Sequence, residues 1–329
     1  MSNREVSRVK ILVLGGTLNH EGAKDALKKL AAESEHEYFF ANDELSDQQL
    51  AEIDILLGNA TGILDRIFSL EKPQLKWIQA FSAGVDYFPL DQLAKRQILL
   101  SNVSGIHAEP IAETVLGMML SHFRGIKDAV VQQQKNHWQP ADFGYTVLSD
   151  KKLAVIGTGH IGTRIAELGQ AFRMETVGVN HSGHPADGFN QTLPLSQMTE
   201  AVKDAAVIVN TLPLTDETRG LYDAEFFAAL EAAPLFINIG RGPSVVTDDL
   251  VAALKAGQVS AAGLDVTAPE PLPEDSQLWQ MDNVLITPHV SGLYQEYAQD
   301  VIKIFKENLQ QYEVDGTLVR NEVDLKKGY

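Results

Sequence analysis

Short apolar runs alternate with helix-length amphipathic segments along the whole chain, and this alternation is the clearest structural signal in the sequence. Strands separated by helices are typical of crossover units, in which successive strands lie parallel in one sheet. The pattern therefore predicts an α/β fold. In the first third of the chain, the expected strands are residues 9–15, 37–41, 53–59, 75–81 and 98–103.

A second series of apolar runs predicts a second sheet. At 329 residues, the chain is long enough for two domains that each bury a core of their own. We therefore expect two doubly wound, parallel-sheet domains. The strands expected in the second sheet are residues 152–157, 175–180, 205–212, 234–240, 260–266 and 283–289.

Two long helical patterns define the predicted domain boundaries. Apolar residues recur at helical spacing from Ile106 to about Gln134, which predicts one continuous crossover helix between the two series. A second pattern, over residues 294–312, follows the last strand, and its apolar stripe must be buried against other elements. We expect this terminal helix to return to the first domain. The predicted domains are residues 1–103 with 292–329, and residues 104–291.

The charge of the chain argues against several classes of partner. The sequence has 27 Lys and Arg against 44 Asp and Glu, a formal charge of −17, which repels nucleic-acid backbones and anionic lipid. It has no Cys, so disulfides, Cys-ligated zinc and thiol catalysis are excluded. No apolar run reaches the roughly 18–20 residues of a membrane span, and the first run is too short for a signal peptide. We expect a cytoplasmic protein that binds neither nucleic acid nor membranes.

A glycine-rich turn predicts a dinucleotide site in the second domain. Gly157, Gly159 and Gly162 form a G-x-G-x-x-G pattern between an expected strand and an amphipathic helix. The first glycine permits the tight turn, the second admits a pyrophosphate, and the third packs the helix on the strand. The backbone N–H groups of His160 and Ile161 should then face the pyrophosphate.

The end of the next strand bears on the choice of cofactor. NAD-binding motifs of this kind usually have a carboxylate there that binds the ribose 2′-OH, whereas this sequence has Asn180. No carboxylate would repel a 2′-phosphate, and His181, Ser182 and His184 can donate hydrogen bonds. We therefore expect NAD(P)H as cofactor, with NADP(H) slightly favoured over NAD(H). A metal site at these two histidines is not expected, because the loop offers no carboxylate ligand beside them.

Three later strand ends carry residues suited to one reaction. Arg241 lies between two glycines, and its guanidinium can bind a carboxylate or carbonyl oxygen in a fork geometry. His289 can supply the proton that a carbonyl needs once hydride has been added. Glu270 can bind the far nitrogen of that ring and set its tautomer. Ligands of open α/β sheets bind beyond the carboxyl ends of the strands, so these three residues are the predicted catalytic set.

The segments GTGHIG, NIGRG, DVTAPEPLP and TPHVSG, in this order and spacing, resemble the D-isomer-specific 2-hydroxyacid dehydrogenase family over nearly the whole chain. The resemblance implies a Rossmann-type dinucleotide-binding domain and a flavodoxin-like substrate domain, completed by the C-terminal helix. It implies the roles given above for Arg241, Glu270 and His289. It also implies that Asp265 contacts the nicotinamide, and that the cofactor is lined by Leu212, Pro213 and Thr218.

Further features of the family apply to the first domain and to assembly. The segment QAFSAGVDYFPL resembles the family's substrate loop, which implies that the N–H groups of Ala83 and Gly84 hold the substrate carboxylate. The family usually forms homodimers through the region of the long helix. Glu270 stands where formate dehydrogenases have Gln, so that subgroup is not expected, and Thr267 replaces a common aromatic residue.

The expected activity is the reduction of a small 2-keto acid to a D-2-hydroxy acid with NAD(P)H. The alternative is a cofactor-sensing, corepressor-like binding protein of the same fold without significant turnover. Consumption of NAD(P)H with a panel of 2-keto acids distinguishes the two. The sequence alone does not indicate which 2-keto acid is used.

Overall fold

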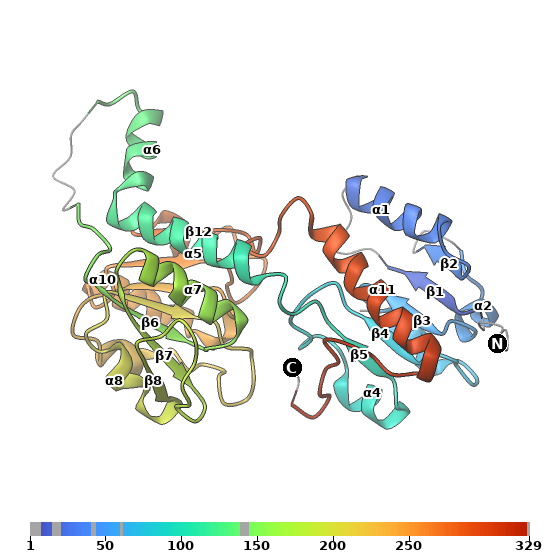
Figure 1. Cartoon of the computed structure of the whole chain (residues 1–329). Helices are drawn as coiled ribbons and strands as arrows, with labels where there is room; N and C mark the ends of the chain where they lie inside the picture. Colours follow the sequence, from blue (N-terminus) through green and yellow to red (C-terminus); the bar gives the residue numbers. More distant parts are fainter. Residues whose placement is uncertain (1–7, 15–20, 41–43, 60–61, 139–144, 328–329) are drawn as a thin grey trace. The chain divides into compact units, whose positions relative to one another are not determined.

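The computed structural model describes residues 8–14, 21–40, 44–59, 62–138 and 145–327 (Figure 1). The chain divides into two compact units, with residues 1–106 and 294–329 in unit 1 and residues 107–293 in unit 2. Which unit holds the substrate and which the cofactor remains a prediction at this point.

Unit 1 is built on a five-stranded parallel sheet with the strand order β2-β1-β3-β4-β5. This is the flavodoxin-like order, in which the chain reverses direction across the sheet next to its first strand. The strands are β1 (Lys10–Val13), β2 (Glu37–Phe40), β3 (Ile55–Leu57), β4 (Trp77–Gln79) and β5 (Leu99–Ser101).

Helices cover both faces of this sheet because side chains alternate between its faces along each strand. Ile11 and Val13 belong to a core cluster with α1 (Glu21–Ala32) and α11 (Tyr297–Asp315). Leu12 and Leu14 belong to the cluster on the other face. That face is covered by α2 (Asp47–Ala51), α3 (Ile63–Ser69) and α4 (Leu90–Arg96).

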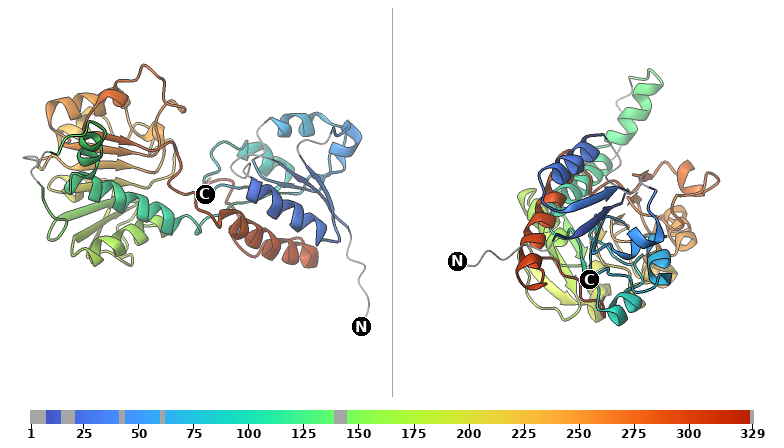
Figure 2. Two further views of the ribbon diagram at one scale, coloured as in Figure 1. Left: turned by 90° about the horizontal axis from the view of Figure 1, so that it is seen from above. Right: turned by 90° about the vertical axis from the view of Figure 1, so that its right-hand side faces the viewer.

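The terminal helix α11 is an integral part of unit 1. It lies beside α1 in the ribbon views (Figures 1 and 2). Phe305 of α11 stacks on Trp77 of β4 with ring centroids 5.3 Å apart. The Tyr297 hydroxyl, at the start of α11, donates to the Phe81 carbonyl just after β4. These contacts bury the apolar stripe of α11, and they place its first turn at the carboxyl end of β4.

Unit 2 contains a seven-stranded parallel sheet with the order β12-β11-β10-β9-β6-β7-β8. The centre has the Rossmann order, with the chain reversing between β6 and β9. The predicted pair of doubly wound α/β sheets is therefore confirmed. The strands are β6 (Lys152–Ile156), β7 (Glu175–Asn180), β8 (Gln191–Pro194), β9 (Val207–Asn210), β10 (Leu235–Asn238), β11 (Ala261–Leu264) and β12 (Val284–Ile286).

Helices also cover both faces of the second sheet. One face packs against α5 (Ala108–Phe123) and α7 (His160–Ala171), which contact each other closely. The other face packs against α8 (Met198–Val202), α9 (Ala224–Ala228) and α10 (Thr247–Ala256). Strand β8 was not predicted, because its sequence QTLP is short, only partly buried and ends in a proline at the sheet edge.

The prediction of one continuous helix from Ile106 to about Gln134 is wrong. The segment forms α5 and then α6 (Ile126–Gln134), with a break at Arg124 and Gly125. Gly125 has a φ of +61°, a left-handed conformation that a residue without a Cβ adopts at no steric cost. The break turns α6 away from the sheet of unit 2 (Figure 1). Within the described residues, no helix has the length and apolar character needed to cross a membrane.

Candidate active site

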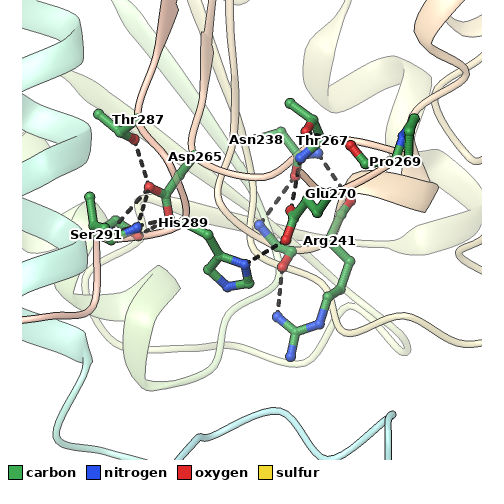
Figure 3. Close-up of polar contacts among 11 residues, drawn as sticks. Asn238, Arg241, Asp265, Thr267, Pro269, Glu270, Thr287, His289 and Ser291 are labelled. Carbon is green, nitrogen blue, oxygen red and sulfur yellow. Dashed lines mark hydrogen bonds and ion pairs between the residues drawn. The ribbon is translucent and has the colours of Figure 1, made fainter. Parts of the chain in front are cut away.

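The predicted catalytic residues of unit 2 lie beyond the carboxyl ends of three neighbouring strands. Arg241 follows β10, Asp265 follows β11 and His289 follows β12, and these strands are adjacent in the sheet. Figure 3 shows the side chains of Arg241, Glu270 and His289 gathered at one place. The strand order thus brings together residues that are up to 48 positions apart in the sequence.

His289 and Glu270 form a direct pair. The His289 Nδ1 atom lies 2.9 Å from Glu270 Oε2, and the two side chains are 54% and 39% exposed. Glu270 Oε1 accepts a hydrogen bond from the Thr267 N–H at 3.0 Å, which fixes the carboxylate. Because a carboxylate only accepts hydrogen bonds, the Nδ1 atom of the ring carries the hydrogen. The Nε2 atom is then the one that can exchange a proton with a bound molecule.

Asp265 holds the segment that carries His289. Its carboxylate is 3% exposed and accepts from the Thr287 hydroxyl at 2.6 Å, the Val290 N–H at 3.0 Å, the Ser291 N–H at 3.1 Å and the Ser291 hydroxyl at 2.5 Å. The His289 N–H also donates to the Asp265 carbonyl at 2.9 Å (Figure 3). These bonds support a role in positioning His289, whereas the contact with nicotinamide implied by the family stays a prediction.

Thr287 and Ser291 were not among the residues predicted from the sequence. The signal for them was available, because they stand two positions before and two positions after His289. Polar side chains on the two sides of a turn can converge on one buried acceptor, as the Thr287 and Ser291 hydroxyls do on Asp265. His289 itself has a φ of +54°, which is unfavourable for a residue with a Cβ. The hydrogen bonds to Asp265 keep it in this conformation.

The backbone of Arg241 is held from two sides. Its carbonyl accepts from Asn238 Nδ2 at 3.0 Å and from the Ser244 hydroxyl at 2.6 Å. Its guanidinium is half-buried and donates to the Gly240 carbonyl at 2.8 Å. A guanidinium carries five N–H donors in a planar fork, and this geometry suits an anion or a carbonyl oxygen.

The glycine-rich turn has the geometry of a phosphate site. A Cβ on Gly162 would lie 1.9 Å from the Gly157 carbonyl oxygen, so only glycine permits this close approach of helix and turn. Helix α7 begins at His160, and no side chain caps its N-terminus. The N–H groups of the first turn, including His160 and Ile161, have no carbonyl one turn earlier. They leave donors for an anion, as a pyrophosphate requires.

The turn after β7 is organised by Asn180. Its Nδ2 donates to Thr158 Oγ1 at 3.1 Å and to the His184 carbonyl at 2.9 Å, and its Oδ1 accepts from the Gly183 N–H at 2.7 Å. Asn180 is buried, while His181 and Ser182 are exposed. The predicted contact of Asn180 with the cofactor is untested. The Ser182 hydroxyl lies 3.1 Å from His184 Nδ1, so these two exposed side chains are paired with each other.

The loop after β9 contains the other predicted cofactor residues. Thr218 is buried, and its hydroxyl donates to the Pro213 carbonyl at 2.7 Å while accepting from the Thr215 N–H at 2.8 Å. The Leu212 N–H donates to Asn210 Oδ1 at 3.1 Å. Thr218 therefore shapes the loop, and Pro213 is exposed at its surface.

The predicted substrate loop of unit 1 leaves two donors unused. The Ala83 carbonyl accepts from Asn102 Nδ2 at 2.8 Å, and the Gly84 carbonyl accepts from the Ser82 hydroxyl at 2.9 Å. The N–H groups of Ala83 and Gly84 donate to no other residue in the described part of the chain. Side chains thus hold the carbonyls of this loop, and its N–H groups remain available to an anion.

This fold and site define a class of protein, the dinucleotide-dependent dehydrogenases with an Arg, a Glu and a His beyond the strand ends. Residues 116–291 match the family model described as D-isomer specific 2-hydroxyacid dehydrogenase, NAD binding domain. The chain is 32% identical to glyoxylate/hydroxypyruvate reductase B of Escherichia coli over 79% of this chain and 81% of that protein. The chain belongs to the D-isomer-specific 2-hydroxyacid dehydrogenase family, as its motifs predict.

Two solved structures show the same likeness. The phosphoglycerate dehydrogenase of Lactobacillus plantarum is 39% identical, with 95% of this chain and all of that chain covered and a TM-score of 0.57. An NADPH-dependent glyoxylate/hydroxypyruvate reductase of Sinorhizobium meliloti, in complex with NADP and sulfate, is 26% identical. That alignment covers 98% of this chain and all of the other, with a TM-score of 0.84.

Proposed function

We propose that the protein reduces a small 2-keto acid to the D-2-hydroxy acid with NAD(P)H. In the overall reaction, the keto acid takes up a hydride at its carbonyl carbon and a proton at the resulting alkoxide. The observation that carries the proposal is the pair of His289 Nδ1 and Glu270 Oε2, 2.9 Å apart, beside Arg241 at the ends of adjacent strands. An intact set of this kind favours turnover over a corepressor-like binding role.

His289 is the proposed proton donor. Its Nδ1–H is bound to Glu270, so a proton on Nε2 can pass to the oxygen of the reduced carbonyl. Glu270 stabilises the protonated ring before the transfer and keeps the ring oriented afterwards. In the reverse direction, the same Nε2 atom accepts the proton of the hydroxyl group.

Arg241 and the loop at Ala83 and Gly84 are the proposed substrate ligands. The guanidinium of Arg241 binds the substrate's carboxylate and polarises its keto oxygen, since a planar fork suits this pair of acceptors. The N–H groups of Ala83 and Gly84 bind the same carboxylate, and their lack of partners among the described residues supports this assignment.

The residues of unit 2 fit a nicotinamide dinucleotide. The close approach at Gly162 and the uncapped start of α7 suit a pyrophosphate next to Gly157 and Gly159. Asp265, Leu212, Pro213 and Thr218 are the further proposed contacts. When bound, the cofactor supplies the hydride.

NADP(H) is the slightly favoured cofactor. The turn after β7 ends in Asn180, His181 and Ser182, with no carboxylate at the strand end to repel a 2′-phosphate. The Sinorhizobium meliloti relative, whose structure contains NADP, supports this preference. Steady-state rates with NADH and NADPH, measured side by side, test it, and a strong preference for NADH would contradict it.

The experiment that tests the reaction itself is a panel of 2-keto acids assayed with each cofactor. His289→Ala should lower kcat by orders of magnitude and leave the Kd for NADPH nearly unchanged, because the ring acts on the substrate. Arg241→Ala should raise KM and lower kcat together. Wild-type turnover in either variant would refute the role assigned to that residue.

We further propose that the protein forms a homodimer through α6 and the described residues 135–138 and 145–147. Large apolar side chains are exposed along this region, with Trp138 99% exposed. Such a surface is typical of an interface. The other large side chains exposed in this region are Ile126, Val130, Tyr145 and Val147. Light scattering should give twice the mass of the chain, and Val130→Asp should give a monomer; a monomeric wild type would exclude the dimer.

A cytoplasmic location is also proposed, since the reaction consumes NAD(P)H, which cells regenerate internally. Cell fractionation with an antibody to the chain tests it, and recovery outside the cytoplasmic fraction would contradict it.

A further inference from the structure

Two peptide groups of the substrate loop carry the N–H groups of Ala83 and Gly84, and both are held by their carbonyl oxygens. The Ser82 carbonyl accepts from the Val103 N–H at 3.3 Å, and the Ala83 carbonyl accepts from Asn102 Nδ2 at 2.8 Å. Both peptides are trans, so the carbonyl and the N–H of each point in opposite directions. A donor that holds the carbonyl on one side of the loop therefore turns the N–H towards the other side.

Asn102 is the side chain that sets the direction of the Gly84 N–H. Its Oδ1 accepts from the Ser104 N–H at 3.0 Å while its Nδ2 donates to the loop, so only one orientation of the amide satisfies both bonds. Asn102 is 6% exposed, its N–H donates to the Asn321 carbonyl at 3.1 Å, and its carbonyl accepts from Gln79 Nε2 at 3.2 Å. The residue cannot turn without breaking several buried hydrogen bonds.

The C-terminal tail, the residues that follow α11, lies against the edge strand β5 (Figure 1). Glu322 pairs with Ser101 in an antiparallel bridge, and the Val323 N–H donates to the Leu100 carbonyl at 2.8 Å. Val323 is 5% exposed and belongs to one of the core clusters of unit 1. The tail is therefore fixed beside the strand that leads into Asn102.

Asn321 connects this tail to the segment after β5. Its Nδ2 donates to the Asn102 carbonyl at 3.2 Å and to the Ser104 carbonyl at 2.9 Å. Its φ is +58°, a left-handed conformation that Asn tolerates better than most residues. The preceding residue is held by the fully buried Asn308 of α11, whose Oδ1 accepts from the Arg320 N–H at 3.0 Å. Helix α11 and the tail thus hold Asn102 by its backbone.

We propose that Asn102 is a positioning residue of the substrate site and that the C-terminal tail holds it in place through Asn321. Asn102 acts through the Gly84 N–H, which binds the carboxylate of the 2-keto acid. The inference rests on the proposed function, since it concerns the same substrate site. If these bonds served stability alone, their loss would lower Tm and leave the KM for the keto acid unchanged.

The first test is Asn102→Asp, which keeps the shape of the side chain but places an acceptor opposite the Ala83 carbonyl. The probe is whichever of glyoxylate, pyruvate and hydroxypyruvate the wild type uses best. A charge-assisted hydrogen bond changes binding by about 10- to 100-fold, so KM should rise at least about 10-fold. The carboxylate is bound alike before and during the reaction, so kcat should stay within about threefold. The Kd for NADPH should not change.

The pH dependence of the same variant separates positioning from a general loss of packing. When the introduced carboxyl is protonated, its O–H can donate to the Ala83 carbonyl in place of the lost Nδ2. The ratio of the variant KM to the wild-type KM should therefore fall as the pH is lowered from about 8 to about 5.5. Titration of His289 affects both proteins and cancels in this ratio.

The second test is Asn321→Gly, which removes the side-chain bonds of the tail and keeps its backbone, because glycine adopts a positive φ freely. A neutral hydrogen bond is weaker, so KM should rise about 2- to 10-fold. Gln97→Gly is the matched control, an amide removed at an exposed residue with a φ of +56°, and it should leave KM unchanged. Combined with Asn102→Asp, the rise should be smaller than the product of the single effects, since Asn321 acts through Asn102.

Thermal unfolding of each variant accompanies the kinetics. If the wild type reduces a keto acid and Asn102→Asp keeps the wild-type KM, the inference is overturned and the reduction of 2-keto acids stands. If Asn102→Asp does not fold, Asn321→Gly decides: a raised KM supports the inference, and a lowered Tm with the wild-type KM overturns it. Equal effects of Asn321→Gly and Gln97→Gly, or a combined rise equal to the product, would remove the tail from the site. If the wild type reduces no 2-keto acid with either cofactor, the proposed function fails and the inference fails with it.

Discussion

Replacing Asp265 by Asn should weaken the hydrogen bonds that hold the segment carrying His289 in place. The carboxylate accepts from Thr287, Val290 and Ser291, four donors in all within one short segment. An Asn side chain keeps the shape of Asp but loses the charge. Its Nδ2 group is a donor, so it faces another donor where the Asp oxygen accepted a hydrogen bond. The variant therefore weakens every bond of this segment at once.

The size of the effect follows from these contacts. A hydrogen bond to a charged group contributes about 1.5–3 kcal/mol and a neutral one about 0.5–1.5 kcal/mol, so the change costs about 1 kcal/mol per bond. The three bonds to Oδ1, from the Thr287 hydroxyl and the N–H groups of Val290 and Ser291, thus lose about 3 kcal/mol. The left-handed backbone of His289, with about 1–2 kcal/mol of strain, favours relaxation of the segment in the wild type and the variant alike, so it leaves the difference of about 3 kcal/mol unchanged. The population with His289 in place should fall by about 100-fold.

The assay is the consumption of NAD(P)H at saturating substrate, together with the Kd of the cofactor from fluorescence titration. We expect kcat to fall by about 100-fold and the Kd to change little. Asp282→Asn is the matched control, because it makes the same chemical change at an exposed residue before β12. Ser291→Ala should have a smaller effect, and combined with Asp265→Asn it should be clearly non-additive.

Three results would refute this reasoning. A kcat within about threefold of the wild type would mean that the segment holds His289 without the carboxylate. Strict additivity with Ser291→Ala would mean that the two residues act separately. A large rise in the Kd of the cofactor with kcat unchanged would instead support the contact between Asp265 and nicotinamide that the family implies.

Three further predictions concern other parts of unit 2. Gly162→Ala should lower Tm and raise the Kd for NADPH at least about 10-fold, because a Cβ would lie 1.9 Å from the Gly157 oxygen. Gly117→Ala, at a position with open space around it, is the control and should change neither quantity. An unchanged Kd for NADPH in Gly162→Ala would contradict the phosphate site. Burial lowers the pKa of His122, so its contribution to stability is present above about pH 6.5 and lost as the pH falls below it. The Tm of His122→Gln should therefore fall less than the wild-type Tm between pH 7.5 and pH 5.5. Equal falls in Tm would contradict this role of His122. Burial raises the pKa of Tyr222 well above its ordinary value, so its contribution to stability is present below about pH 10 and lost as the pH rises further. Tyr222→Phe should remove this alkaline fall in Tm, and it should cost about 1 kcal/mol at neutral pH because Asn210 Oδ1 loses a donor. A fall of the same size in the variant would mean that another group causes it.

Much of the fold was determined by local patterns in the sequence. Each predicted strand overlaps a strand of the structure, because buried parallel strands require short apolar runs whatever their neighbours are. The glycine spacing at Gly157 and Gly162 identified the turn before α7, since its close approach depends on residues only a few positions apart. Arg241, Glu270 and His289 were identifiable because each lies just beyond a strand end.

Tertiary structure alone decided which partners these residues meet. The bonds from Val290 and Ser291 to Asp265 cross 25 and 26 positions, and they depend on the order and register of β11 and β12. The break at Gly125 depends on a backbone conformation that the helical pattern does not contain. Sheet order sets which distant donors and acceptors come within 3 Å of each other, and a one-dimensional pattern of apolar and polar residues carries no information about that order.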